Sequence, residues 1–294
     1  MRLVTFTHAG RTAMGALIAG PAGERVVDLH ALDARIPAGM LEFLEAGTAA
    51  QDLARLALAG VAPGAGVPLA QVMLRAPIPR PGKIICIGQN YREHVRETNA
   101  TVPETPVIFA KYGNAVIGHG EPIVLPAAVE RPDYEGELGV VIGRRCRNVP
   151  EAQALDYVAG YTVINDVTAR DWQFRNSQWT LGKTPDTFCP MGPALVTADE
   201  VGDVQNLGLR TVVSGEVMQQ GHTSDMIFSV ATLIWDMARI MTLEPGDVIA
   251  TGTPSGVGFT RTPPRLLRPG DVVRIEIERI GALENPVVAE GAAE

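Results

Sequence analysis

The sequence predicts a mainly β protein with flanking helices, an α+β fold that includes a small β-rich domain at the N-terminus. Short apolar runs bounded by Gly, Pro or Asn recur along the chain, as strands of such a fold do. Helical patterns are fewer, and the regular alternation of strand and helix that marks a doubly wound parallel sheet is missing. With 294 residues, the chain is long enough for a small domain plus a larger one.

The first segment has the pattern of a small meander of strands followed by two short helices. Alternating runs predict strands at residues 2–7, 14–19 and 25–29, and apolar spacing predicts helices around 40–47 and 52–60. The stretch "APIPRPG" contains three prolines, which exclude helix and suit a junction between domains. We therefore expect a boundary near residue 78, with a β-rich domain at 1–78 and a catalytic domain at 79–294.

The second segment contains most of the strand signals. They occur at 83–88, 107–112, 122–126, 135–143, 158–166, 209–217, 246–252 and 272–280. Helical patterns cover about 91–98, 168–176 and 226–241. The last of these contains Asp236 and Arg239 and is too short to span a bilayer, so we expect a buried amphipathic helix.

Composition narrows the class of protein. A formal net charge of −8 and a pI near 5.2 disfavour nucleic acid or an anionic membrane as the main partner. The first residues, "MRLVTFTHAGRTAMG", lack the continuous apolar stretch of a signal peptide. Cys86, Cys146 and Cys189 are odd in number and far apart, which argues against a disulfide framework. We expect a protein of the reducing cytoplasm.

Three carboxylates stand at the ends of two expected strands. Glu135 and Glu137 are two residues apart in "DYEGELGVVIG", so a strand points both side chains to the same face, where like charges repel. Asp166 ends the apolar run "YTVIN". Carboxylate oxygens suit Mg²⁺ or Mn²⁺, and such a cation would cancel the repulsion if the three acids meet. Two other interpretations remain open at this point: a solvated strand face for the glutamates and a helix N-cap for Asp166.

A helix is expected to begin in "GQNYREHVRE". Asn90 and Glu93 have the spacing of a capping box. His94 and Glu97, three residues apart, then share one helical face, where the carboxylate can orient the imidazole as a general base that activates water. A solvated helix turn is the alternative for this pair.

Three loops offer further polar groups. Lys183 lies between Gly182 and Thr184 in a constrained loop, where it could meet an anionic substrate group; Ser177 replaces the glycine that a P-loop would need. "ATGTPSGVG", which contains Gly252 and Thr253, offers backbone amides and hydroxyls to a carboxylate, or is a tight turn. In "GEVMQQGHTSD", Gln219 and His222 precede a helix that Ser224 or Asp225 could cap, and His222 is expected to be structural.

These stretches together resemble the fumarylacetoacetate hydrolase family, in particular its smaller bacterial members related to acylpyruvases and to isomerase/decarboxylases of aromatic catabolism. The matching blocks run in order from about residue 83 to 280: "GQNYREHVRE", "FAK", "DYEGELGVVIG", "GYTVINDVTARD", "GKTPDTFCPMGP", "GEVMQQGHTSDMIF" and "LEPGDVIATGTPSGVG". The first segment resembles the variable N-terminal domain of the family only loosely. The resemblance implies a mixed β-roll or sandwich with flanking helices, assembled as a homodimer.

The resemblance also implies residue roles. Glu135, Glu137 and Asp166 would bind one Mg²⁺ or Mn²⁺ per subunit, and His94 with Glu97 would activate water. Lys183 would stabilise a developing enolate or oxyanion. The substrate contacts would come from Gln219, Thr253 and the Gly252 turn.

The reaction expected from this resemblance is hydrolysis of a C–C bond in an acylpyruvate-like β-diketo acid. A 2-keto acid can chelate the cation, which acts as a Lewis acid, while a general base delivers water. The alternative is a decarboxylase or keto–enol isomerase that uses the same metal site on oxaloacetate-like or 2-hydroxyhepta-2,4-dienedioate-like substrates. A non-catalytic metal- or ligand-binding module is a weaker alternative, because it would not need His94, Glu97 and Lys183 together.

Overall fold

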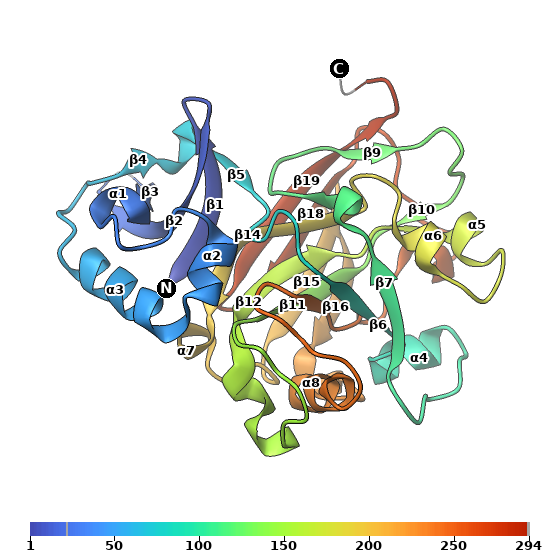
Figure 1. The fold of residues 1–294 in the computed structure, drawn as a ribbon. Helices are drawn as coiled ribbons and strands as arrows, with labels where there is room; N and C mark the ends of the chain where they lie inside the picture. The colour runs from blue at the N-terminus through green and yellow to red at the C-terminus, as the bar shows by residue number, and fades with distance from the viewer. Residues whose placement is uncertain (22, 293–294) are drawn as a thin grey trace.

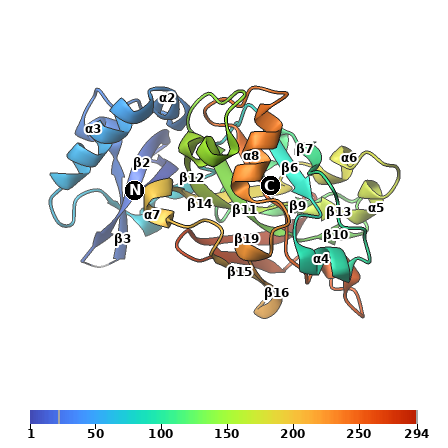
Figure 2. The ribbon, with the colours of Figure 1, turned by 90° about the horizontal axis from the view of Figure 1, so that it is seen from below.

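Two β-sheets packed against each other, with helices on the outside, form the structure (Figure 1). It is a computed structural model that describes residues 1–21 and 23–292. The predicted α+β fold is confirmed. Seen from below, helices α2 and α3 lie at the N-terminal end of the molecule and helix α8 covers the central strands (Figure 2). These helices span Met40–Glu45, Gly47–Ala59 and Val230–Ala238.

The larger sheet has 12 strands and runs from the N-terminal segment to the centre of the second segment. In spatial order its main path is β4 (Val67–Pro68), β3 (Gly23–Asp28), β2 (Arg11–Gly20), β1 (Arg2–His8), β14 (Cys189–Thr197), β12 (Val158–Asn165), β11 (Gly136–Ile142), β17 (Val248–Ala250), β6 (Ile84–Gly88) and β7 (Val107–Lys111). Strand β5 (Met73–Arg75) pairs with β1, and β8 (Val116–Ile117) pairs with β14.

The second sheet has five strands and packs on β11, β12 and β14. Its order is β16 (Glu216–His222), β15 (Gly208–Val213), β18 (Val272–Ile277), β19 (Gly281–Ala289) and β9 (Ile123–Leu125). A separate two-stranded pair joins β10 (Pro132–Asp133) to β13 (Thr168–Ala169). Strand β10 ends two residues before Glu135 and β13 begins two residues after Asp166, so their pairing brings the two chain segments that carry the acids together.

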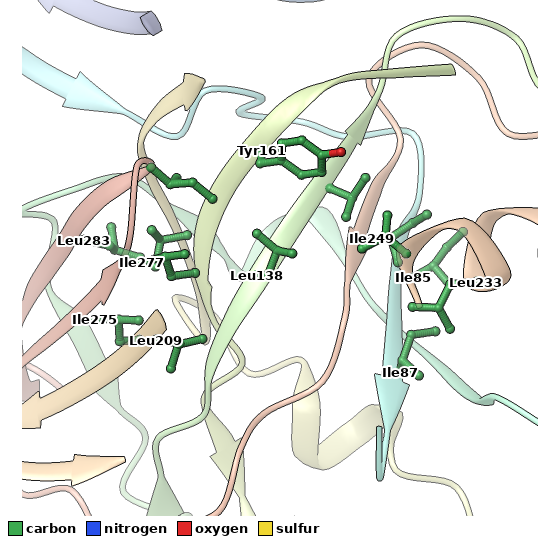
Figure 3. Close-up of a cluster of buried hydrophobic side chains, with 14 of the residues drawn as sticks. Ile85, Ile87, Leu138, Tyr161, Leu209, Leu233, Ile249, Ile275, Ile277 and Leu283 are labelled. Atoms are coloured by element: carbon green, nitrogen blue, oxygen red, sulfur yellow. The ribbon is translucent and has the colours of Figure 1, made fainter. Parts of the chain in front are cut away.

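The main core explains why β11 is a continuous apolar run instead of an alternating one. All seven of its residues are buried, as expected for a strand covered on both faces. Figure 3 shows Leu138 of β11 between two apolar groups. One group comes from β6, β17 and α8 and consists of Ile85, Ile87, Ile249 and Leu233; the other comes from the second sheet and consists of Leu209, Ile275, Ile277 and Leu283.

The N-terminal meander is present as predicted, and its sheet continues into the rest of the molecule. Strand β1 pairs with β2 on one side and with β14 on the other, where Leu3 faces Leu195. Helix α1 (Leu29–Leu32), together with α2 and α3, covers the N-terminal strands of the sheet. Backbone pairing between β1 and β14 joins the two segments across the expected boundary near residue 78. The boundary itself stays a prediction.

Two of the predicted helices are shorter than expected. The pattern at 226–241 forms α8, which begins at Val230 because the Ser229 side chain accepts a hydrogen bond from the Thr232 N–H; the expected cap by Ser224 or Asp225 is wrong. The pattern at 168–176 forms a two-residue strand and then α5 (Arg170–Gln173). In the described part of the chain, no helix is long and apolar enough to cross a bilayer.

The helix predicted at 91–98 is present as α4 (Arg92–Glu97), but the capping box is wrong. Its N-cap residue is Tyr91, and Asp225 from a distant loop accepts the Glu93 N–H at 3.0 Å. The Asn90 side chain is fully buried and donates to Thr251 O (2.8 Å) and Phe228 O (3.1 Å), and it accepts from Phe228 N (2.8 Å). Asn90 therefore joins three loops that surround one end of the central sheet.

We expect Asn90→Ala to destabilise the protein by about 2–4 kcal/mol, because one buried and two partly buried backbone groups lose their partners and each fully buried loss costs about 1–3 kcal/mol. Urea denaturation followed by circular dichroism measures the change. Asn114→Ala is the matched control. The Asn114 side chain donates to a backbone carbonyl and to a carboxylate, but it does so on the surface, so this variant should lose less than about 1 kcal/mol of unfolding free energy. Equal losses for the two variants would contradict this role of Asn90.

Candidate metal centre and active site

Glu135, Glu137 and Asp166 meet at one end of the central sheet. Strands β11 and β12 are antiparallel neighbours, and Gly136 pairs with Asn165. Glu135 and Glu137 flank Gly136, while Asp166 directly follows Asn165, and the Asp166 N–H donates to Glu135 O at 2.9 Å. One carboxylate oxygen from each of the three acids lies within 4.8 Å of the others, and all three residues are buried. The solvated strand face is therefore excluded for the two glutamates.

Three cationic side chains surround these acids. Lys183 Nζ lies 2.7 Å from Glu135 Oε2 and 2.7 Å from Asp166 Oδ2. Lys111 Nζ lies 2.7 Å from the other oxygen of Asp166, so Asp166 is an ion-pair partner and not a helix cap. The Arg170 guanidinium forms ion pairs with Glu135 Oε1 at 2.6 Å and with Asp133 at 2.9 Å.

The charges of the buried cluster do not balance. Asp133, Glu135, Glu137 and Asp166 face only Lys111, Lys183 and Arg170. The unpaired group is Glu137, whose Oε2 accepts one hydrogen bond, from the Gly252 N–H at 2.9 Å. Among the described residues Glu137 has no ion-pair partner. Burial and the nearby charges of Asp166 and Glu135 raise the pKa of Glu137 well above its usual value.

The pKa values of the neighbouring Glu135 and Lys183 shift in the directions that favour their charged forms. Burial alone would raise the pKa of Glu135, but the charges of Lys183 and Arg170 outweigh it and hold that pKa far below its usual range. Burial opposes the charge of Lys183, yet Asp166 and Glu135 raise the pKa of Lys183 to about 12. In the metal-free protein Lys183 is therefore held in its protonated form, whereas Glu137 lacks a compensating cation and is driven toward its neutral form.

This donor set fits a divalent cation. Hard cations such as Mg²⁺ and Mn²⁺ prefer carboxylate oxygens, and here three such oxygens converge. An isolated buried carboxylate is costly unless it is paired or binds a metal. A cation bound by Glu135, Glu137 and Asp166 would supply the charge that Glu137 lacks, and the centre would then attract an anionic substrate.

His94 and Glu97 form a pair on α4 beside this centre. His94 Nδ1 lies 3.2 Å from Glu97 Oε2. The other oxygen of Glu97 accepts hydrogen bonds from the Gly256 N–H (2.9 Å) and the Thr260 hydroxyl (2.8 Å). Although burial opposes it, hydrogen bonds from His94, Thr260 and Gly256 lower the pKa of Glu97. Because an ionised Glu97 can only accept, the His94 Nδ1–H must donate, and in the neutral imidazole this tautomer leaves Nε2 without a proton.

A cavity of about 250 Å³ lies between the acidic centre and this pair. Glu135, Glu137, Lys183, His94 and Thr253 line it. Its remaining walls combine apolar groups with two polar side chains of α5, and they include Ile87, Phe109, Phe174, Trp179, Phe259, Arg170 and Gln173. A larger groove, of about 1180 Å³, runs along β15, β16 and β18. Glu135, Glu137 and Asp166 do not line it. His222 lines that groove, outside the candidate site.

Gln219 and Gly252 lie behind the wall of the cavity, whereas Thr253 is part of the wall. Gln219 accepts from the Gly136 N–H at 2.9 Å and donates to Thr253 Oγ1 at 2.7 Å. Gly252 has a φ of +101° and directs its N–H to Glu137, and a Cβ there would lie 2.8 Å from the Asn90 Cβ. Both residues hold the site together, and a direct contact with substrate stays a prediction.

Sequence reasoning missed four charged or polar residues of the site: Lys111, Asp133, Arg170 and Gln173. Two signals were available. Asp133 precedes Glu135 by two residues and so shares its face, and Arg170 and Gln173 are three apart on the helix expected after Asp166. Lys111 ends the apolar run "VIFAK", but nothing in the sequence places β7 beside Asp166.

Comparison with known proteins places this geometry in a family. A family model described as "Fumarylacetoacetate (FAA) hydrolase C-terminal" matches residues 83–288. A mitochondrial oxaloacetate tautomerase of Xenopus laevis is 45% identical over 290 residues, covering 98% of this chain and 90% of the relative. The structure of a 2-hydroxyhepta-2,4-diene-1,7-dioate isomerase from Mycobacterium marinum has a TM-score of 0.77 and 38% identity, covering 99% of both chains.

A further similar structure contains ligands. The maleylpyruvate hydrolase from Sphingobium sp. SYK-6, solved with manganese(II) and pyruvate, has a TM-score of 0.81 and 33% identity, covering 98% of this chain and 99% of the other. The relatives therefore include both isomerases and a hydrolase.

We expect Glu137→Gln to stabilise the metal-free protein and to abolish its stabilisation by Mn²⁺. The amide keeps an acceptor for the Gly252 N–H and removes an uncompensated charge, a gain of roughly 1–3 kcal/mol at pH 7. The folded protein holds the pKa of Glu137 above its ordinary value of 4.5. The wild type without metal should therefore lose stability as the pH rises above about 4.5, and the variant should lose that part of the slope.

Urea denaturation with chelator and with Mn²⁺, at several pH values, measures these effects. Glu276→Gln, on the surface of β18 and paired with Arg210 and Arg274, is the control and should keep the Mn²⁺-dependent stabilisation. A Glu137→Gln protein that Mn²⁺ stabilises as much as the wild type would remove Glu137 from the metal centre.

Proposed function

Because the chain belongs to the fumarylacetoacetate hydrolase family, we propose that it is a divalent-cation-dependent tautomerase that interconverts the keto and enol forms of oxaloacetate or a closely similar 2-keto dicarboxylic acid. The observation that carries this proposal is that Glu137, a member of the acidic cluster with no ion-pair partner among the described residues, lines one cavity together with Lys183 and His94. The similarity to oxaloacetate tautomerases over nearly the whole chain supports it.

The acids and the cations of the site have separate tasks in this proposal. A divalent cation held by Glu135, Glu137 and Asp166, with Mg²⁺ or Mn²⁺ as the candidates, supplies Lewis acidity that makes the C–H bond next to the keto group easier to break. The Lys183 ammonium group lines the cavity and stabilises the negative charge that develops on the substrate oxygen. Arg170, also in the wall, attracts the carboxylates of the substrate.

His94 moves the proton. Glu97 accepts the Nδ1–H, so Nε2 is available to take a proton from the carbon next to the keto group and to return it to the enolate oxygen. Gly256 and Thr260 hold Glu97, which fixes the orientation of the imidazole. No water molecule is consumed, so this reaction needs a base and a cation but no site for a nucleophile.

The hydrolysis of an acylpyruvate, the first expectation from the sequence, becomes the second candidate. The same His94–Glu97 pair would activate water in that reaction, and the similarity to a maleylpyruvate hydrolase favours it. Against it, the relatives that match this chain at 45–47% identity over 98% of its length are named tautomerases. A non-catalytic binding module has no use for an oriented base in the cavity wall.

Assembly and location belong to the same proposal. We propose a homodimer that acts on a small-molecule substrate in the cytoplasm; its three cysteines are buried and free, as in a reducing compartment. The Xenopus laevis relative is named as mitochondrial. Light scattering that gives the monomer mass of 31.3 kDa would contradict the dimer, and fractionation of the source cell would test the location.

We expect the wild type with Mn²⁺ to accelerate keto–enol conversion of oxaloacetate, followed by the ultraviolet absorbance of the enol. Removal of one general base typically costs roughly 10²–10⁴-fold, so His94→Asn should lose activity by that factor and Glu97→Gln by less. His222→Asn is the matched control, because His222 lies in the separate groove, and it should keep full activity.

Cleavage of acetylpyruvate by the same preparations, with metal content measured, distinguishes the two candidates. A kcat/KM for cleavage above that for enol conversion would favour the hydrolase. No metal-dependent turnover of either substrate would contradict both.

A further inference from the structure

Lys111 is a buried lysine of the acidic cluster that does not line the substrate cavity. We propose that Lys111 is a positioning residue of the metal centre, which fixes the Asp166 carboxylate so that one oxygen stays directed at the cation. The inference rests on the cation dependence proposed above. Lys111 would act through Asp166 and would not contact the substrate.

Two lysines divide the oxygens of Asp166 between them. Lys111 Nζ lies 2.7 Å from Oδ1 and Lys183 Nζ lies 2.7 Å from Oδ2. The side chains of Asp166 and Lys111 have no exposed surface. With an ionic partner on each oxygen, the carboxylate cannot rotate without breaking a buried ion pair, which is strongly unfavourable.

The second contact of each lysine differs. Lys183 also bonds Glu135 Oε2 at 2.7 Å and lines the cavity. Lys111 instead donates to the backbone carbonyl of Val167 at 3.1 Å and does not line the cavity. Lys183 therefore bridges two of the candidate metal ligands, whereas Lys111 contacts Asp166 alone.

The backbone holds Lys111 firmly in this position. It is the last residue of β7 and pairs with Ile84 of β6. The next N–H, that of Tyr112, donates to Thr184 Oγ1 at 2.9 Å, directly after Lys183 in the chain. The ends of β7 and α6 (Thr180–Lys183) are thus joined, and the two lysines approach Asp166 from a shared, rigid frame.

These contacts predict different effects on Mn²⁺ affinity for two similar substitutions, Lys183→Met and Lys111→Met. Lys183→Met frees Glu135 and Asp166 and removes a repelling charge, so Mn²⁺ should bind equally well or more tightly. Lys111→Met also removes a repelling charge, which by Coulomb's law favours the cation, but it releases Asp166. Outer partners of metal ligands typically contribute 10–100-fold to metal affinity, so Lys111→Met should weaken Mn²⁺ binding by roughly that factor.

The experiment is titration of the full-length metal-free protein with Mn²⁺, by calorimetry and by the electron paramagnetic resonance signal of free Mn²⁺. Wild type, Lys183→Met, Lys111→Met and Lys111→Gln are compared at one pH, and urea denaturation establishes that each is folded. Lys111→Gln lacks the charge but keeps a hydrogen-bond donor, so it should recover part of the affinity. It also carries the test if Lys111→Met fails to fold.

Weaker binding by Lys111→Met, with recovery in Lys111→Gln, supports the positioning role. The contrary result is that both Lys111 variants bind Mn²⁺ as tightly as the wild type or more tightly, while their unfolding midpoints fall. Lys111 would then serve only the fold, or its charge would only repel the cation, and the inference would be wrong. If the wild type itself does not bind Mn²⁺, the proposed function fails first and the inference fails with it.

Discussion

The structure depends on the burial of four carboxylates against three cations at the end of strands β11 and β12. Glu135, Glu137 and Asp166 are brought together by the pairing of Gly136 with Asn165, which the apolar core on both faces of β11 enforces. A carboxylate in such a place is tolerated when a cation or a metal compensates it. Glu137 lacks that compensation among the described residues, and a bound divalent cation would supply it.

The loops around the centre are arranged by the same requirement for polar partners. Gly252 donates to Glu137, Gln219 connects Gly136 to Thr253, and Asn90 ties two neighbouring loops to the start of α4. These contacts place the His94–Glu97 pair at the cavity. The proposed base, the Lys183 ammonium group and the candidate metal ligands therefore belong to one connected network, an arrangement that would suit the proposed proton transfer without reorganisation.

The sequence predicted the fold class, the helix that carries His94 and the three acids, because strand periodicity and the end of an apolar run directly determine which side chains share a face. It failed where partners come from distant segments. Asn90 has the spacing of a capping box, yet its side chain bonds loops at 228 and 251. Lys111 ends an ordinary apolar strand, and only the tertiary pairing of β6, β7 and β17 brings it to Asp166. The preference for hydrolysis came from the resemblance to acylpyruvases and from the water-activating role given to His94 and Glu97, a pair that serves proton transfer equally well.

The most direct test of the metal centre is an anomalous-scattering map of a crystal soaked in Mn²⁺ at neutral pH. The account predicts one strong peak in coordination distance of oxygens from Glu135, Glu137 and Asp166, with Lys111 still on Asp166 and Lys183 displaced from at least one of its two carboxylates. A protein that binds no Mn²⁺ there, with Lys183 still bridging Glu135 and Asp166, would contradict it.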